Sequence, residues 1–311
     1  MSKKSKDSLT NTPKNKVRKH NLEYFDDSNF ETKNINEVTS LLLNSYKTYN
    51  GRQFLNDDDL NSVLPSDKIE LGRLTLSYIL MKHRWKGNFC SPIKAKLNES
   101  GTTILDVGCC PGLRAIDMGL KYPSSLIIAI DINHSNFPSS EECPSNDQWI
   151  IVIKELVRVL AYDGWIEFTE PDQMAKKGGK NLLWLMDSFS NACREIKDVN
   201  IQIYEKIPKY IKEVDELEDL NYTSVDYPLG EWYGCFGEYA AENFKRALQS
   251  VVFLPKYMEL SNEKFNDLLN DCVEEANKNE AFFKIYKYFA KKRFNYLTFY
   301  NIILLNGKFI L

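Results

Sequence analysis

The 311-residue chain has no run of about 18 consecutive apolar residues, the length that a membrane-spanning helix needs, so the sequence predicts no membrane segment. It has only three histidines and no pair of cysteines at CxxC spacing, and we therefore expect neither a histidine-based triad nor a bound metal. An excess of one charge is also missing, since 40 Lys and Arg stand against 43 Asp and Glu. This balance argues against a nucleic-acid-binding surface.

Seven cysteines are present, an odd number without the spacing of a disulfide framework, and the polar N-terminus does not read as a signal segment. These features predict an intracellular protein, cytoplasmic or nuclear. The 43% hydrophobic content, with 13% aromatic residues, is enough to bury a substantial core.

Composition and periodicity divide the chain into successive parts. Lysines dominate the first twenty residues, which predicts a disordered tail. Asp67 and Glu70 have the spacing of a capping box in front of an amphipathic helix. We expect these parts: 1–35, a disordered basic tail; 36–100, an N-terminal helical segment; 101–205, an α/β core; 206–280, a helical cap with an acidic linker between Glu213 and Asp226; 281–293, a returning strand; and 294–311, an atypical apolar tail.

The core part begins with two short apolar strands, 103–107 and 126–130, separated by a helix-like stretch at 113–121. Strands that are apolar on both faces, with a helix between them, are typical of a parallel α/β unit. The periodicity then predicts these elements: a helix at 148–160, a strand at 165–169, a helix at 180–196, a strand at 199–204 and a helix capped by Ser261.

A glycine-containing turn, 106–112, joins the first strand to its helix, and Asp131 ends the second strand. In such a unit the strand ends and the helix N-terminus form a ligand crevice, where an acid can accept hydrogen bonds from a ribose diol. The G-x-G-x-x-G spacing of dinucleotide folds is missing. The acid Asp106, two residues before Gly108, suits a cationic ligand, so the chemistry favours S-adenosylmethionine over a nicotinamide and leaves both open.

The segment 104–123, ILDVGCCPGLRAIDMGLKYP, closely resembles motif I of the seven-strand (class I) S-adenosylmethionine-dependent methyltransferases, typically Asp-Val-Gly-Cys-Gly-Pro-Gly. More narrowly, the chain resembles a fungal group of that family that includes regulators of secondary metabolism. The resemblance covers roughly residues 50–292 and rests on further segments: 51–54, 64–67, 70–74, 87–89, 91–92, 155–160, 164–167, 170–172 and 228–292.

The resemblance implies a Rossmann-like fold with a helical cap inserted before the last strand, and transfer of a methyl group from S-adenosyl-L-methionine to an acceptor that the sequence does not identify. It implies that Asp106 and Gly108 hold the methionine end of the donor, that Gly112 lets the helix begin close to it, and that Asp131 binds the ribose. Cys110 also belongs to this cofactor-binding set. No catalytic residue is identified.

Two departures from the family bear on activity. Cys110 replaces the middle glycine of the motif, at a position where a positive φ would strain a side chain and weaken donor binding. Between Asp131 and the next helix, residues 132–146 are too short for the family's third strand, helix and fourth strand. The resulting sheet is reduced: either the strand at 165–169 pairs directly with the strand at 103–107, or a flank stays unpaired.

These departures keep a second function open, a catalytically impaired methyltransferase-like protein that acts by binding a protein partner. Glu170 and Asp172, after the strand at 165–169, are placed to line a substrate pocket or simply to be solvated. Five aromatic residues form a cluster that we expect in the core of the cap rather than in an acceptor pocket: Tyr227, Trp232, Tyr233, Phe236 and Tyr239.

Overall fold

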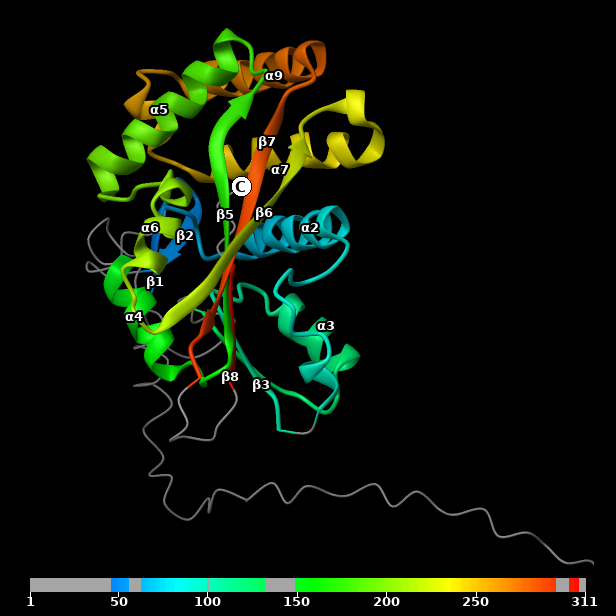
Figure 1. Ribbon diagram of the computed structural model, residues 1–311. Coiled ribbons are helices and arrows are strands. Elements are labelled where there is room, and N and C mark those ends of the chain that lie inside the picture. The colour runs from blue at the N-terminus through cyan, green and yellow to red at the C-terminus, as the bar shows by residue number, and fades with distance from the viewer. Residues whose placement is uncertain (1–45, 56–62, 100, 132–148, 295–301, 308–311) are drawn as a thin grey trace, which may run out of the picture. The chain divides into compact units, whose positions relative to one another are not determined.

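The computed structural model describes residues 46–55, 63–99, 101–131, 149–294 and 302–307, the last of these by its backbone alone (Figure 1). All of them belong to one unit of the chain, Asn44–Leu311. The predicted tail at 1–35, the N-terminal part of the 36–100 segment and the short stretch 132–146 lie outside the described residues, and the other predicted domain boundaries stay predictions.

A six-stranded sheet forms the centre of this unit (Figure 1). In spatial order its strands are β4 (Leu126–Ile130), β3 (Thr103–Val107), β8 (Ile302–Gly307), β5 (Trp165–Lys176), β7 (Phe282–Lys292) and β6 (Leu217–Pro228). The first four are parallel to one another, whereas β7 is antiparallel to both β5 and β6. The predicted Rossmann-like α/β fold with a mostly parallel sheet is confirmed.

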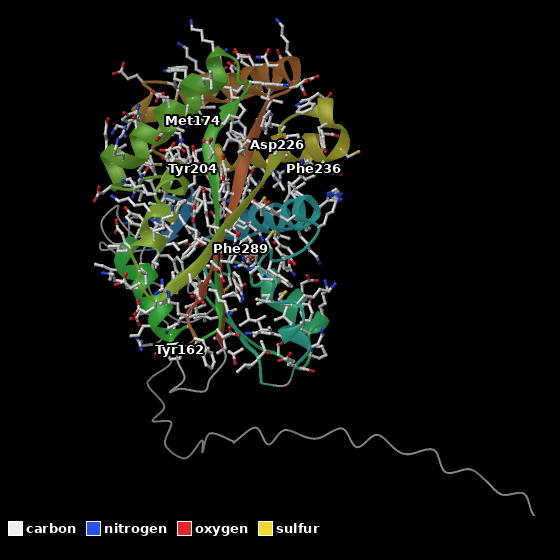
Figure 2. All side chains as sticks on the ribbon, in the orientation of Figure 1. Tyr162, Met174, Tyr204, Asp226, Phe236 and Phe289 are labelled. Carbon is white, nitrogen blue, oxygen red and sulfur yellow. The ribbon has the colours of Figure 1, made fainter. Side chains whose placement is uncertain are left out.

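Helices cover both faces of the sheet. Trp165 packs in one hydrophobic cluster with Ile104 and Met118, and Met118 lies on α3 (Leu113–Lys121). The next residue, Ile166, packs in another cluster with α4 (Trp149–Val159) and α6 (Ile207–Lys212). Because successive side chains of a strand point to opposite faces, α3 and α4 lie on opposite sides of β5. Figure 2 shows the same division, with Tyr204 and Phe236 on either side of the strands.

The largest hydrophobic cluster lies at the far ends of β5 and β7. It draws its buried side chains from helices that the sequence places in or beside the cap: α5 (Lys180–Lys197), α7 (Gly234–Ser250), α8 (Leu254–Tyr257) and α9 (Asn262–Asn279). Shorter elements complete the description: a hairpin of β1 (Tyr46–Tyr49) and β2 (Arg52–Leu55), and the 3-10 turns η2 (Lys96–Asn98), η3 (Ile203–Glu205) and η4 (Glu231–Tyr233). No helix among the described residues is long and apolar enough to cross a membrane.

Two helix starts predicted from sequence are confirmed. Helix α2 (Lys68–Trp85) is capped by Asp67, whose carboxylate accepts hydrogen bonds from the backbone N–H groups of Ile69 and Glu70. The Glu70 side chain binds Arg73 and Ser250 in the structure, so the reciprocal half of the predicted capping box is replaced by a buried polar network. Ser261 caps α9 through the N–H of Lys264.

Three predicted elements are wrong. The expected strand at 199–204 is a turn followed by η3, and its alternating apolar side chains are buried without joining the sheet. The expected acidic linker forms the edge strand β6, where solvent on one side tolerates the acids. Strand β5 continues to Lys176, so Glu170 and Asp172 lie within it and are buried.

The centre of the sheet differs from one of the two expected arrangements, direct pairing of β5 with β3, and agrees with the other, because the described sheet leaves the flank of β4 unpaired. Strand β5 does not pair with β3, because β8 lies between them, with Asp106 opposite Leu305 and Leu305 opposite Glu167. The segment expected to be an atypical tail therefore supplies an inner strand. Strand β4 is left at the edge, and Leu126, Ile128 and Ile130 on one of its faces are 59%, 42% and 44% exposed, where the sequence predicted a strand buried on both faces.

Candidate functional site

The turn between β3 and α3 folds over the end of β4. Three of its residues have left-handed backbone conformations, with φ of 70° at Gly108, 51° at Cys110 and 74° at Gly112. The N–H groups of Gly108 and Cys109 both donate to the carbonyl oxygen of Ile130, at 2.9 and 3.1 Å. Gly112 then caps α3, which confirms the prediction that the helix begins there.

Cys110, at the position of the middle glycine, has a positive φ, the condition under which the sequence analysis expected its side chain to be strained. A side chain in this conformation costs about 1 to 3 kcal/mol, which the rest of the fold has to offset. Burial, followed by the charge of Asp131, raises the pKa of the Cys110 thiol, and burial with Asp131 and Asp106 raises that of Cys109 to about 12. Both thiols are therefore protonated at neutral pH and are poor nucleophiles.

Asp131 lies at the end of β4 and reaches back to the turn. Its Oδ2 accepts a hydrogen bond of 2.7 Å from the backbone N–H of Cys110. The structure thus brings all five residues of the predicted cofactor-binding set to one end of β3 and β4, although the described part of the chain does not test their role.

Arg114 is a site residue that the sequence analysis missed. It lies in the first turn of α3, and its Nη2 donates to Oδ1 of Asp106, which is almost completely buried. Burial alone would lower the pKa of Arg114, but the charge of Asp106 outweighs it and the pKa is raised. Oδ2 of Asp106 has no hydrogen-bond partner among the described residues. The sequence held one signal for Arg114. It follows the capping residue Gly112 by two positions, which places it in the first turn of the helix, close to the strand that precedes the turn.

A second buried ion pair includes Glu167, which lies in the same row of the sheet as Asp106. Glu167 of β5 accepts from Lys287 of β7 at 2.9 Å and from the backbone N–H groups of Cys90 and Ser91 at 2.8 Å each. Lys287 also donates to the carbonyl oxygen of Asn88. Burial would raise the pKa of Glu167, but the charge of Lys287 and the two N–H donors lower it. Through these hydrogen bonds the ion pair holds residues 88–91, which follow α2, against the sheet.

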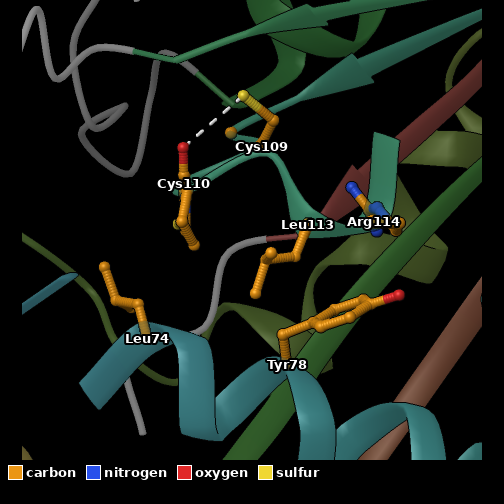
Figure 3. Close-up of a pocket in the computed structure, with 8 residues that line it drawn as sticks. Leu74, Tyr78, Cys109, Cys110, Leu113 and Arg114 are labelled. Carbon is orange, nitrogen blue, oxygen red and sulfur yellow. Dashed lines mark hydrogen bonds between the residues drawn. The ribbon is translucent and has the colours of Figure 1, made fainter. Parts of the chain in front are cut away.

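A small cavity of about 30 Å³ lies between α2 and the turn (Figure 3). Figure 3 shows Leu74 and Tyr78 of α2 facing Cys110 and Arg114 across it. Its lining consists of Leu74, Tyr78, Gly108, Cys109, Cys110, Pro111, Leu113 and Arg114. This volume is enough for about one water molecule and is too small for a nucleoside.

Other candidates from the sequence lie away from this site. Glu170 and Asp172 are an odd number of residues from Glu167 along β5, so their side chains point to the opposite face of the sheet. Both are buried, so the alternative that they are solvated at a strand end is wrong. In the aromatic cluster Tyr227 is buried, but Trp232, Tyr233 and Tyr239 are exposed, so the prediction that the cluster forms core is wrong for those three. Among the described residues no group of three or more His, Cys, Asp or Glu is placed to hold a metal ion.

No protein-family model and no curated protein matches the chain. Among solved structures it is similar to phosphoethanolamine N-methyltransferase 2 of Haemonchus contortus in complex with S-adenosyl-L-methionine, with 12% identity and a TM-score of 0.41 over 85% of this chain and 75% of that chain. A mycolic acid cyclopropane synthase is 12% identical, with a TM-score of 0.39 over 64% and 84% of the two chains. A SAM dependent methyltransferase from Archaeoglobus fulgidus is 13% identical, with a TM-score of 0.34 over 69% and 99%. Similarity at this level assigns neither a ligand nor an activity to this chain.

Proposed function

We propose that the chain binds S-adenosyl-L-methionine at the ends of β3 and β4 and transfers its methyl group to an acceptor. The observation that carries the proposal is the buried carboxylate of Asp106, whose Oδ2 has no hydrogen-bond partner among the described residues. A buried charge of this kind is costly unless a ligand or a protein group satisfies it. Arg114, which binds this carboxylate, and Gly108, two residues after Asp106 in the sequence, both line the cavity.

The residues present fit the polar groups of the donor. A buried carboxylate is a suitable acceptor for the α-ammonium group, and Asp131 carries a second carboxylate, each of whose oxygens accepts more than one hydrogen bond, for the ribose hydroxyls. Gly108 and Gly112 have left-handed backbone conformations and carry no side chain of their own that would obstruct a ligand, and Gly108 lines the cavity. The motif I resemblance of residues 104–123 supports the same assignment.

When bound, the donor supplies an activated methyl group on a sulfonium. The role of the protein is to hold and align the donor and to exclude water. In a displacement of this kind, these effects supply most of the lowering of the activation barrier. Leu74, Tyr78 and Leu113 form the apolar wall that would exclude water. We assign no general base and no acceptor.

Isothermal titration calorimetry with S-adenosylhomocysteine tests the proposal. We expect wild-type protein to bind it and Asp106→Asn to lose binding by about tenfold or more, because a hydrogen bond to a charged group contributes about 1.5 to 3 kcal/mol. Glu155→Gln is the control, since this exposed acid pairs with Arg158 on α4 and does not line the cavity. Absence of binding at high protein concentration would overturn the proposal.

A second candidate is a methyltransferase-like protein that binds a partner and has no activity. The exposed apolar face of β4 favours it, because an edge strand with the sequence LIIAI has no charged residue to prevent pairing with another chain. Inserting a strand-helix-strand segment after Asp131 separates the two candidates. If donor binding appears only in the extended protein, the partner-binding function is favoured for this chain.

A further inference from the structure

We propose that the chain forms a twofold-symmetric dimer in which the β4 strands of two copies pair side by side and antiparallel, centred on Ile128. The partner at this edge of the sheet is thus a second copy of the same chain. The inference goes beyond the proposed function, because it concerns an interaction surface and does not depend on binding of the methyl donor.

The outer edge of β4 presents the backbone groups of two residues. The N–H of Leu126 donates to Thr102, just before β3, and the carbonyl oxygen of Ile130 accepts from the turn after β3. Because the N–H and C=O groups of successive residues point to alternate sides of a strand, Ile127 and Ala129 direct theirs away from β3. In the described part of the sheet no strand lies on that side of β4.

These outward groups match those of a second copy in the proposed register. With Ile128 opposite its own symmetry mate, Ile127 of each copy lies opposite Ala129 of the other. Each such pair exchanges two N–H···O=C hydrogen bonds, so the outward donors and acceptors of both strands are all satisfied. This reciprocity is what a twofold axis requires of a contact between identical surfaces.

The side chains of β4 suit the same register. Leu126, Ile128 and Ile130 are exposed on one face of the strand, and β4 contains no charged residue. In the proposed pair, Leu126 of each copy lies opposite Ile130 of the other. The exposed apolar side chains of the two copies therefore form one continuous patch across the axis, and no like charges meet.

Helix α3 adds a second apolar surface beside this edge. One flank of α3 contacts α2 through Asp117, whereas Gly119 on another flank faces Ile127 of β4. Ile116 precedes Gly119 by three residues and so lies on the β4 side, and both Ile116 and Leu120 are exposed. Stable interfaces bury about 1,200 to 2,000 Å² in total, so this surface supplies area that a pair of short strands alone would lack.

The opposite edge of the described sheet shows how this chain protects a strand that faces solvent. Strand β6 contains the acids Glu218, Asp219 and Asp226, and its register with β7 is irregular between Glu218 and Asn221. Charged side chains and bulges both hinder pairing at a sheet edge. Strand β4 has neither, since its sequence is LIIAI and its register with β3 is regular. This contrast favours β4 as the edge that pairs with a second copy.

Sedimentation velocity of the full-length protein over a series of concentrations tests the inference. We expect wild-type protein to dimerise and Ile128→Lys to raise the dissociation constant of the dimer by about tenfold or more, because the new charge faces its own symmetry mate. Tyr222→Lys, at an exposed aromatic residue of the β6 edge, is the matched control and should leave the dimer unchanged. The melting temperature shows whether each variant is folded.

Disulfide cross-linking with copper phenanthroline tests the register and covers the case in which Ile128→Lys fails to fold. Ile128→Cys should form a linked dimer, because opposite residues of a non-hydrogen-bonded pair have Cα atoms about 4.5 Å apart, which a disulfide can span. Leu126→Cys alone should not cross-link, since its symmetry mate is about 13 Å away along the strand, but a mixture with Ile130→Cys should. The wild-type chain is the control for oxidation of the native cysteines.

A wild-type protein that stays monomeric at every concentration would overturn the inference. A lower melting temperature of Ile128→Lys in that case would show that another part of the same chain covers β4. A dimer that Ile128→Lys leaves intact, or that Tyr222→Lys disrupts, would also overturn it, because another surface would then hold the two copies together. Cross-linking of Leu126→Cys alone would contradict the register. None of these measurements uses the methyl donor, so the inference and the proposed function stand or fall separately.

Discussion

At the scale of single residues, Cys110 stands out because a thiol side chain occupies a left-handed position in the turn that holds the site together. Its N–H binds Asp131 and its side chain lines the cavity. The same residue thus supports the geometry of the crevice through its backbone and reduces the free space through its side chain.

Replacement of this cysteine is the first prediction. Cys110→Gly should tighten binding of S-adenosylhomocysteine by about 1 kcal/mol or more, because it removes both the strain of a positive φ and a side chain from the cavity. The greater freedom of glycine in the unfolded chain acts on a different quantity: it lowers the folding stability by roughly 0.5 to 1 kcal/mol. Calorimetry and the melting temperature without ligand measure the two effects separately. Weaker binding in Cys110→Gly would show that the thiol is part of the binding surface.

The raised pKa of Cys109 gives a second prediction. Only the thiolate reacts with iodoacetamide, so a thiol with a pKa of about 12 should stay unmodified at pH 8 while exposed Cys235 in the same sample is alkylated. The rate at Cys109 should still be rising between pH 8 and 10. Mass spectrometry of the peptides reads out both sites. Equal rates at pH 8 would mean that the turn opens readily or that Cys109 is not buried.

At the scale of elements, the buried pair of Glu167 and Lys287 connects two strands to the segment that follows α2. Glu167→Gln should lower the free energy of unfolding by about 3 to 5 kcal/mol, because it leaves the charge of Lys287 buried without its partner. Glu155→Gln, at an exposed pair, should leave the stability unchanged within error. Urea titration measures both.

The same pair has a pH dependence of known sign. Since the folded protein lowers the pKa of Glu167, its contribution to stability is present above the ordinary value of 4.5 and is lost as the pH falls through the lower folded value. The difference between wild type and Glu167→Gln should therefore narrow in acid. A difference that is constant from pH 7 to pH 3 would contradict the assigned ion pair.

Elements with strong local signals were predictable from sequence. Strands β3 and β4 are short β-branched runs, and α9 has an N-cap and a regular apolar face. Strand β6 was missed because an edge strand tolerates the acids that local rules assign to a linker. The alternation of Val199, Ile201 and Ile203 indicated a strand, but these side chains enter the core from a turn. Tertiary packing decides such cases.

The site shows the same limit. The five predicted residues follow one another closely or end neighbouring strands, so local sequence was enough to group them. Arg114, Glu167 and Lys287 come from a helix and two other strands, and only the packing of α3 and the order and register of the sheet bring these charged groups near the turn.

At the scale of the whole molecule, the sheet depends on a strand from near the end of the chain. Strand β8 pairs with both β3 and β5, so its removal would separate the β3–β4 pair from the rest of the sheet. A chain ending at Lys292 should lose cooperative unfolding and expose apolar surface, because no other described strand joins these two parts. Urea titration followed by circular dichroism measures this effect. An unchanged midpoint and slope would show that β8 is dispensable.

The central claim is that the crevice at the ends of β3 and β4 holds the methyl donor. Ultraviolet cross-linking of methyl-labelled S-adenosylmethionine, followed by peptide mapping, tests this location most directly. The account predicts that the label falls within residues 103–131, that excess S-adenosylhomocysteine prevents labelling, and that Asp106→Asn abolishes it. Specific label confined to peptides outside this stretch, or no competed label at all, would contradict the account.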